Sequence, residues 1–141
     1  MRITFDLELR KSKSELELVM ELRGLHPSLW MIYSFAALYA WLRWREDLII
    51  TSMLRPGDAG VHAYGRGMDI DVDEKAGYQG LAPANARELA DAINAAFEYD
   101  PSRPEYRVAV YGAADSSGRH WNHIHLQAHA RTMPLRTELI A

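Results

Sequence analysis

The spacing of apolar residues along the chain predicts several helices. Residues 14–25 place apolar side chains three or four positions apart, which is the repeat of one helix face. Residues 28–46 contain the most hydrophobic run, and Ser28 stands where an N-cap residue is expected. The clearest helical stripe lies within residues 81–100, where Pro83 suits a first turn.

Short segments between these helices have the pattern of strands. Apolar and polar residues alternate over residues 3–9, and residues 47–54 form an apolar run that is typical of a buried strand. Further strands are predicted within residues 68–73, 106–112 and 122–128. The chain has no internal repeat and no long linker, so we expect one α+β domain that spans residues 1–141.

The composition narrows the classes of partner and of chemistry. The 141 residues carry a formal net charge of −3 and include no cysteine. Nucleic-acid binding usually requires a basic face, so neither a nucleic-acid partner nor a histidine-based nuclease is expected. Without cysteine there are no disulfides and no thiolate ligands, so a metal would be held by His, Asp or Glu.

The apolar segment 29–42 is too short for stable membrane insertion. A spanning helix needs about 20 apolar residues, whereas Ser34 interrupts this segment and Arg43 follows its end. We expect a core helix here, with a helix on the membrane surface as the alternative. The N-terminus lacks the apolar region of a signal peptide, which predicts a protein that is cytoplasmic as synthesised.

Four of the six histidines lie between residues 120 and 129, in the sequence HWNHIHLQAH. On a strand, His123 and His125 project from one face while Ile124 and Leu126 project from the other, toward a core. Two imidazoles fixed side by side suit a metal or a proton-transfer site. The alternative is that they are polar residues on the solvent face of a strand.

A second histidine and a carboxylate occur in VHAYGRGMDIDVD, where His62 precedes Asp69 by seven residues. Gly65 and Gly67 lie between them, so this loop can adopt positive φ or pack tightly against a neighbour. The alternative is a glycine-rich turn that leads into an edge strand. Combined with the last strand, the segment offers a His-Asp-His donor set with one open position, the arrangement of catalytic zinc sites.

These motifs resemble the zinc D-Ala-D-Ala peptidases, a group that also includes the lysostaphin-type endopeptidases and the Hedgehog signalling domain. The shared pattern is His62-x6-Asp69 followed by His123-x-His125, with the upstream segment LIITSMLRP similar to the family's strand that ends in an arginine. The resemblance covers about residues 28–128 and leaves residues 1–27 as an N-terminal extension. It implies an antiparallel central sheet with helices packed on it.

The resemblance also implies a role for each motif residue. His62, Asp69 and His125 correspond to the zinc ligands, and the family's spacing selects Asp69 where periodicity alone does not separate it from Asp71. His123 corresponds to the histidine that handles protons. Arg55 corresponds to the arginine that stabilises the oxyanion or the substrate's carboxylate.

The implied activity is Zn²⁺-dependent hydrolysis of peptide bonds next to D-alanine in peptidoglycan stem peptides, by a carboxypeptidase or an endopeptidase. By analogy, such a small enzyme without a signal peptide would be a phage or prophage lysis enzyme that acts at the cell wall when released. One residue departs from the pattern: Asn122 stands where several branches have the carboxylate base. His123 is therefore the expected base, and a catalytically silent zinc-binding interaction domain of the Hedgehog type is the alternative.

Overall fold

Five strands form the central sheet of this computed structural model, which describes residues 1–53, 65–73, 80–112 and 123–135. In spatial order the strands are β1 (Thr4–Phe5), β2 (Ile49–Ser52), β3 (Gly67–Asp71), β6 (His123–Gln127) and β5 (Ala109–Val110). β1 runs parallel to β2, and every other neighbouring pair in this sheet is antiparallel. The expected α+β class is therefore confirmed, with a mostly antiparallel sheet.

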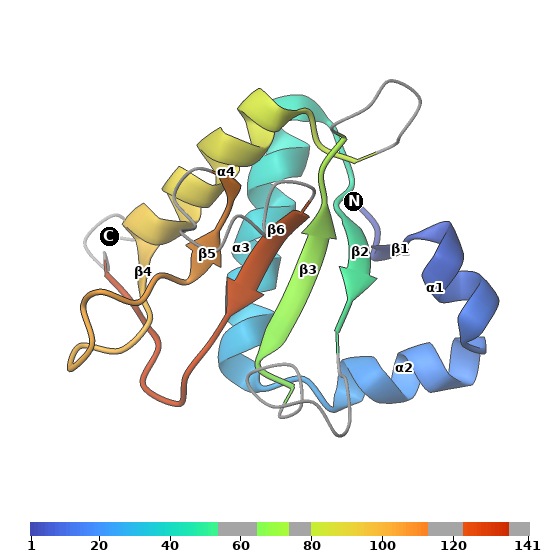
Figure 1. The fold of residues 1–141 in the computed structure, drawn as a ribbon, viewed down its shortest axis with the longest axis horizontal. Helices are drawn as coiled ribbons and strands as arrows, with labels where there is room; N and C mark the ends of the chain where they lie inside the picture. The colour runs from blue at the N-terminus through green and yellow to red at the C-terminus, as the bar shows by residue number, and fades with distance from the viewer. Residues whose placement is uncertain (54–64, 74–79, 113–122, 136–141) are drawn as a thin grey trace.

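Two long helices, α3 (Pro27–Trp44) and α4 (Pro83–Ala96), pack against the sheet and against each other. Figure 1 shows them on one side of the strands. Two shorter helices, α1 (Leu7–Ser12) and α2 (Glu15–Arg23), lie beyond the β1–β2 side. The opposite face of the central strands is therefore left without a helix from the described residues.

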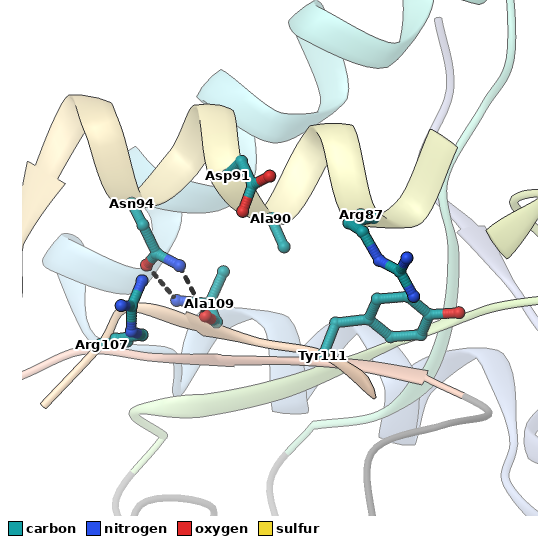
Figure 2. Close-up of a pocket in the computed structure, with 7 residues that line it drawn as sticks. All are labelled: Arg87, Ala90, Asp91, Asn94, Arg107, Ala109 and Tyr111. Atoms are coloured by element: carbon teal, nitrogen blue, oxygen red, sulfur yellow. Dashed lines mark hydrogen bonds between the residues drawn. The ribbon is translucent and has the colours of Figure 1, made fainter. Parts of the chain in front are cut away.

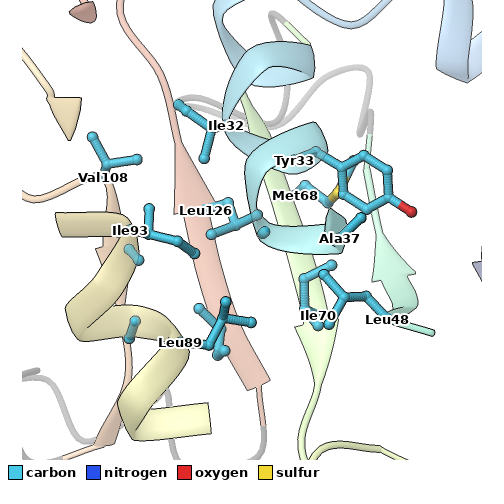
Figure 3. Close-up of a cluster of buried hydrophobic side chains, with 14 of the residues drawn as sticks. Ile32, Tyr33, Ala37, Leu48, Met68, Ile70, Leu89, Ile93, Val108 and Leu126 are labelled. Carbon is cyan, nitrogen blue, oxygen red and sulfur yellow. The ribbon is translucent and has the colours of Figure 1, made fainter. Parts of the chain in front are cut away.

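The hydrophobic core lies between the sheet and the two long helices (Figure 3). Met68 and Ile70 of β3 and Ile124 and Leu126 of β6 are almost completely buried there, together with Ile93 of α4. Burying each such side chain contributes about 1.5–3 kcal/mol. This burial fixes which way β3 and β6 face, because successive strand residues point to opposite sides. The residues between these apolar positions must then point away from the core.

Helix α3 begins at Pro27 instead of after Ser28, because His26 is the N-cap. The Nδ1 atom of His26 accepts a hydrogen bond from the backbone N–H of Ser28 at 3.1 Å, and Pro27 occupies the first helical position. The expected Ser28 cap is therefore wrong. The helix ends at Trp44, and its C-cap residue Arg45 has a left-handed φ of 58°. Within the described residues, no helix is both long and apolar enough to cross a membrane.

The prediction of a strand over residues 3–9 is confirmed only at Thr4–Phe5 and is wrong for the residues that follow. β1 contains only Thr4–Phe5, and α1 follows at once. The carboxylate of Asp6 accepts a hydrogen bond from the backbone N–H of Leu9 at 2.8 Å, which is an N-cap contact. This cap satisfies a helix donor that an alternating apolar pattern does not reveal.

Two further boundaries differ from the sequence pattern. The strand expected over residues 106–112 is limited to β5, and the helix expected to reach residue 100 ends at Ala96. After that helix, β4 (Phe97–Glu98) pairs with β7 (Met133–Pro134) in a small second sheet. Because this pairing joins segments far apart in the chain, local periodicity does not predict it.

Candidate metal centre

The pairing of β3 with β6 brings the predicted chemical groups onto one face of the sheet. Asp69 lies directly opposite His125, and Asp71 lies directly opposite His123. The apolar residues that alternate with them are buried toward the helices. The predicted alternation of His123 and His125 with core residues is therefore confirmed. Side chains paired in this way have Cβ atoms about 4.5–5.5 Å apart, close enough to share a ligand.

Asp69 is the residue that both histidines approach. The distance from its Oδ1 atom to Nδ1 of His125 is 3.0 Å, and the distance to Nε2 of His123 is 3.8 Å. Asp69 is only 8% exposed, while the side chains of His125 and His123 are 12% and 22% exposed. A carboxylate that is buried to this extent needs a partner, because its desolvation is costly. The nearby imidazoles supply one, and His123 is the more exposed of the two.

The neighbouring strand β2 contains a bulge where it pairs with Asp69. Ile50 pairs with Ile70 and Ser52 pairs with Asp69, so Thr51 is an extra residue on β2. The hydroxyl of Thr51 donates a hydrogen bond to the backbone carbonyl of Asp69 at 3.3 Å. Bulges of this kind bend a strand locally and redirect its side chains. Sequence reasoning missed Thr51, since its segment has the pattern of an ordinary buried strand.

Gly65 positions the chain immediately before β3. Its φ is +68°, a conformation that side-chain-bearing residues rarely adopt, and a Cβ atom there would collide with the carbonyl oxygen of Gly24. The expectation of positive φ or tight packing is therefore confirmed at Gly65, whereas Gly67 is the first residue of β3. The N-terminal extension is thus in contact with the segment that leads to Asp69.

Asp71 has different surroundings from those of Asp69. Burial raises the pKa of its carboxyl group, and the negative charges of Asp6 and Asp73 raise it further. In the described part of the chain, its carboxylate makes no hydrogen bond to either strand histidine. Asp69 is the carboxylate that lies between the two imidazoles.

The donor chemistry of Asp69 and His125 fits a zinc ion. Zinc binds carboxylate oxygen and imidazole nitrogen at about 2.0–2.2 Å, so two ligand atoms on a tetrahedral ion lie about 3.3 Å apart. The observed separation of 3.0 Å between Oδ1 and Nδ1 is that of a direct hydrogen bond, which a shared ion would replace. Both residues stand on paired strands, which hold their side chains in place. The pair can therefore supply two adjacent ligands.

Two of the residues predicted for the site, His62 and Arg55, lie outside the described residues. The structure brings together Asp69, His123 and His125 from the remaining set. Across residues 1–53, 65–73, 80–112 and 123–135, no three His, Cys, Asp or Glu side chains are arranged to hold a metal by themselves. No protein-family model, curated protein or solved structure matches the chain.

Proposed function

We propose that this protein is a zinc-dependent metallopeptidase that hydrolyses peptide bonds next to D-alanine in peptidoglycan stem peptides. The observation that carries the proposal is the pairing of Asp69 with His125 across β3 and β6, with His123 beside them. His62 would complete the proposed ligand set through the sequence motif, and three protein ligands leave one position of a tetrahedral ion open. Action at the cell wall after release belongs to the same proposal.

Each residue has a distinct role in the proposed reaction. His62, Asp69 and His125 would hold the ion, which supplies a Lewis acid and an activated water. His123, the most exposed of the three described groups, accepts the proton of the attacking water and passes it to the leaving amine. By the family resemblance, Arg55 would supply a positive charge to the tetrahedral oxyanion, a contribution that can reach several kcal/mol.

The first experiment measures metal content in matched carboxylate variants. Purified wild-type protein should contain one zinc ion per chain. The Asp69→Asn variant should lose most of it, because the amide is a much weaker ligand than the carboxylate. Asp71→Asn is the matched control on the same strand face and should retain zinc. Loss of zinc in the Asp71→Asn protein, with retention in Asp69→Asn, would overturn the choice of ligand.

The second experiment measures hydrolysis of muropeptides by the zinc-loaded protein. Released D-alanine reports carboxypeptidase activity, and loss of crosslinked dimers reports endopeptidase activity. A chelator should abolish whichever activity is present, and added zinc should restore it. The His123→Gln variant should keep its zinc and lose about two or more orders of magnitude in rate.

A second candidate function is a zinc-binding interaction domain without catalysis. Asn122 favours it, because an amide is unable to act as the base that several related branches place at this position. Zinc-loaded protein that binds muropeptides without hydrolysing either substrate type would establish this function. Full activity in the His123→Gln variant would instead exclude His123 as the base.

A further inference from the structure

A pocket of about 400 Å³ lies between α4 and β5, on the helix side of the sheet edge (Figure 2). Residues of α4 line one wall, and the strand segment with Arg107, Ala109 and Tyr111 lines the other. Ala109 pairs with Leu126, a core residue, whereas the candidate metal centre occupies the opposite face of the sheet. This pocket is therefore separate from Asp69 and the two strand histidines.

Asn94 closes the pocket floor by binding the backbone of the edge strand. Its Nδ2 atom donates to the carbonyl oxygen of Ala109 at 2.8 Å, and its Oδ1 atom accepts from the N–H of Ala109 at 2.9 Å. Both backbone groups that Ala109 turns to the outside are thus satisfied. An added strand would have to displace Asn94 to pair here. The pocket therefore offers side chains, rather than free backbone, to a ligand.

Three charged side chains surround this floor, and none of them has an ion-pair partner among the described residues. Arg87 and Asp91 stand on the same face of α4 as Asn94, and Arg107 lies across the pocket (Figure 2). In the part of the chain that the structure describes, none of the three forms a salt bridge. Glu88, which follows Arg87, instead contacts Arg43 on α3 at 3.1 Å. The pocket thus presents two guanidinium groups and one carboxylate that no described residue pairs with.

The order of these charges defines the ligand that would complement them. Figure 2 shows Arg107 at the Asn94 end, Arg87 at the Tyr111 end, and Asp91 between them along the helix. Asn94 is seven positions after Arg87 on the helix, a rise of about 10 Å. Guanidinium groups prefer carboxylates, which they bind through paired hydrogen bonds. Asp91 disfavours an anion midway and favours an ammonium group.

We propose that this pocket binds a small amino dicarboxylate ion. One carboxylate binds Arg87, the other binds Arg107, and the ammonium group lies near Asp91. The ligand has the charge order negative, positive, negative, which is complementary to the lining. This site is independent of zinc, so it is tested by binding and not by hydrolysis.

The test is a titration of the full chain with L-glutamate and, separately, with glutarate at low ionic strength. Binding is monitored through the backbone amide signals in NMR spectra. Glutarate has the same two carboxylates without the ammonium group. Saturable shifts are expected at Asn94 and Ala109 with both compounds. Arg87→Gln and Arg107→Gln should each weaken binding about tenfold, the usual consequence of losing one charge-assisted contact.

Two further variants separate specific binding from general attraction of anions. Arg23→Gln removes one positive charge from α2, far along the chain, and should leave both affinities unchanged. Asp91→Asn should strengthen glutarate binding, and it should weaken glutamate binding relative to glutarate binding. The proposal is overturned by shifts that do not saturate, by equal effects of Arg23→Gln and the two pocket variants, or by an Asp91→Asn variant with unchanged preference.

Discussion

The backbone N–H of His26 donates a hydrogen bond to the carbonyl oxygen of Gly65, with an N–O distance of 2.8 Å. His26 is also the N-cap of α3, and Gly65 precedes the strand that carries Asp69. One short contact therefore joins the start of the main helix to the approach to the candidate metal centre. It also explains why Gly65 tolerates no added side chain, since Gly24 lies against it.

Replacing Gly65 with alanine should destabilise the protein and impair the site together. The new Cβ atom would meet the carbonyl of Gly24, and the left-handed φ of +68° would itself be strained. Strain of this kind costs about 1–3 kcal/mol before the collision is added. Denaturant unfolding should show at least that loss, with reduced zinc content in the same preparation. An unfolding free energy of Gly65→Ala equal to that of the wild type would contradict this prediction, because it would mean that the backbone around residue 65 adjusts to the new side chain without cost.

Asn94→Ala should lower the free energy of unfolding by about 2 kcal/mol, because it leaves the N–H and the carbonyl of Ala109 without their partners. Asn85→Ala is the matched control on the same helix. Both changes gain the same helix propensity, so the difference between them isolates the contacts to the edge strand. Thermal unfolding that is equal in the two variants would mean that water replaces Asn94 at no cost.

The stability of the protein should fall in acid through Asp100. The backbone N–H of Ser102 is the main cause that lowers the pKa of this carboxyl group to about 2, with help from the Ser102 hydroxyl and Arg103. Because the folded pKa is below the ordinary value, the carboxylate stabilises the fold above about pH 4. That contribution is lost as the pH falls from about 4 toward 2.

The measurement for Asp100 compares unfolding free energies of the wild type and Asp100→Asn across this pH range. The wild type should be more stable by a constant margin at neutral pH, and the margin should shrink below about pH 4. Glu105→Gln, an exposed carboxylate in the following turn, is the control and should show no such trend. A margin that is independent of pH would contradict the assignment to the charged form.

Removal of the metal should lower the midpoint of thermal unfolding. An ion that binds only the folded state stabilises it by mass action, so a chelator should reduce the midpoint of the zinc-loaded wild type. Asp69→Asn should already have the lower midpoint and respond little to the chelator. Asp71→Asn should respond as the wild type does. Equal chelator responses in all three proteins would place the bound metal somewhere other than at Asp69.

Local patterns predicted the long elements well. The alternation in residues 122–128 predicted which side of β6 would be buried, and Pro83 marked the start of α4. Burial of alternate strand residues and the fixed φ of proline explain this success, because each acts within a few residues of its signal. The segment around Asp6 shows the limit, since one side-chain cap converts an alternating pattern into a helix.

Helix α2 shows a second limit of local reasoning. Its start was predicted, and Ser14 forms the capping box there. The apolar residues at its helical repeat are nevertheless exposed, with Leu16 at 70% and Met20 at 54%, while Leu18 is buried. The helix lies at the side of the sheet, where the buried direction depends on neighbours from other parts of the chain.

The sequence by itself determined that His123 and His125 share one face, because alternation is a property of a single strand and the apolar residues between them require burial. Periodicity left Asp69 and Asp71 equivalent, since both lie on the same face of β3, and only the family resemblance selected Asp69. The tertiary structure decided which histidine each carboxylate faces. The pairing register of β3 with β6 places Asp69 opposite His125, and register depends on which strands meet, not on the pattern within either one.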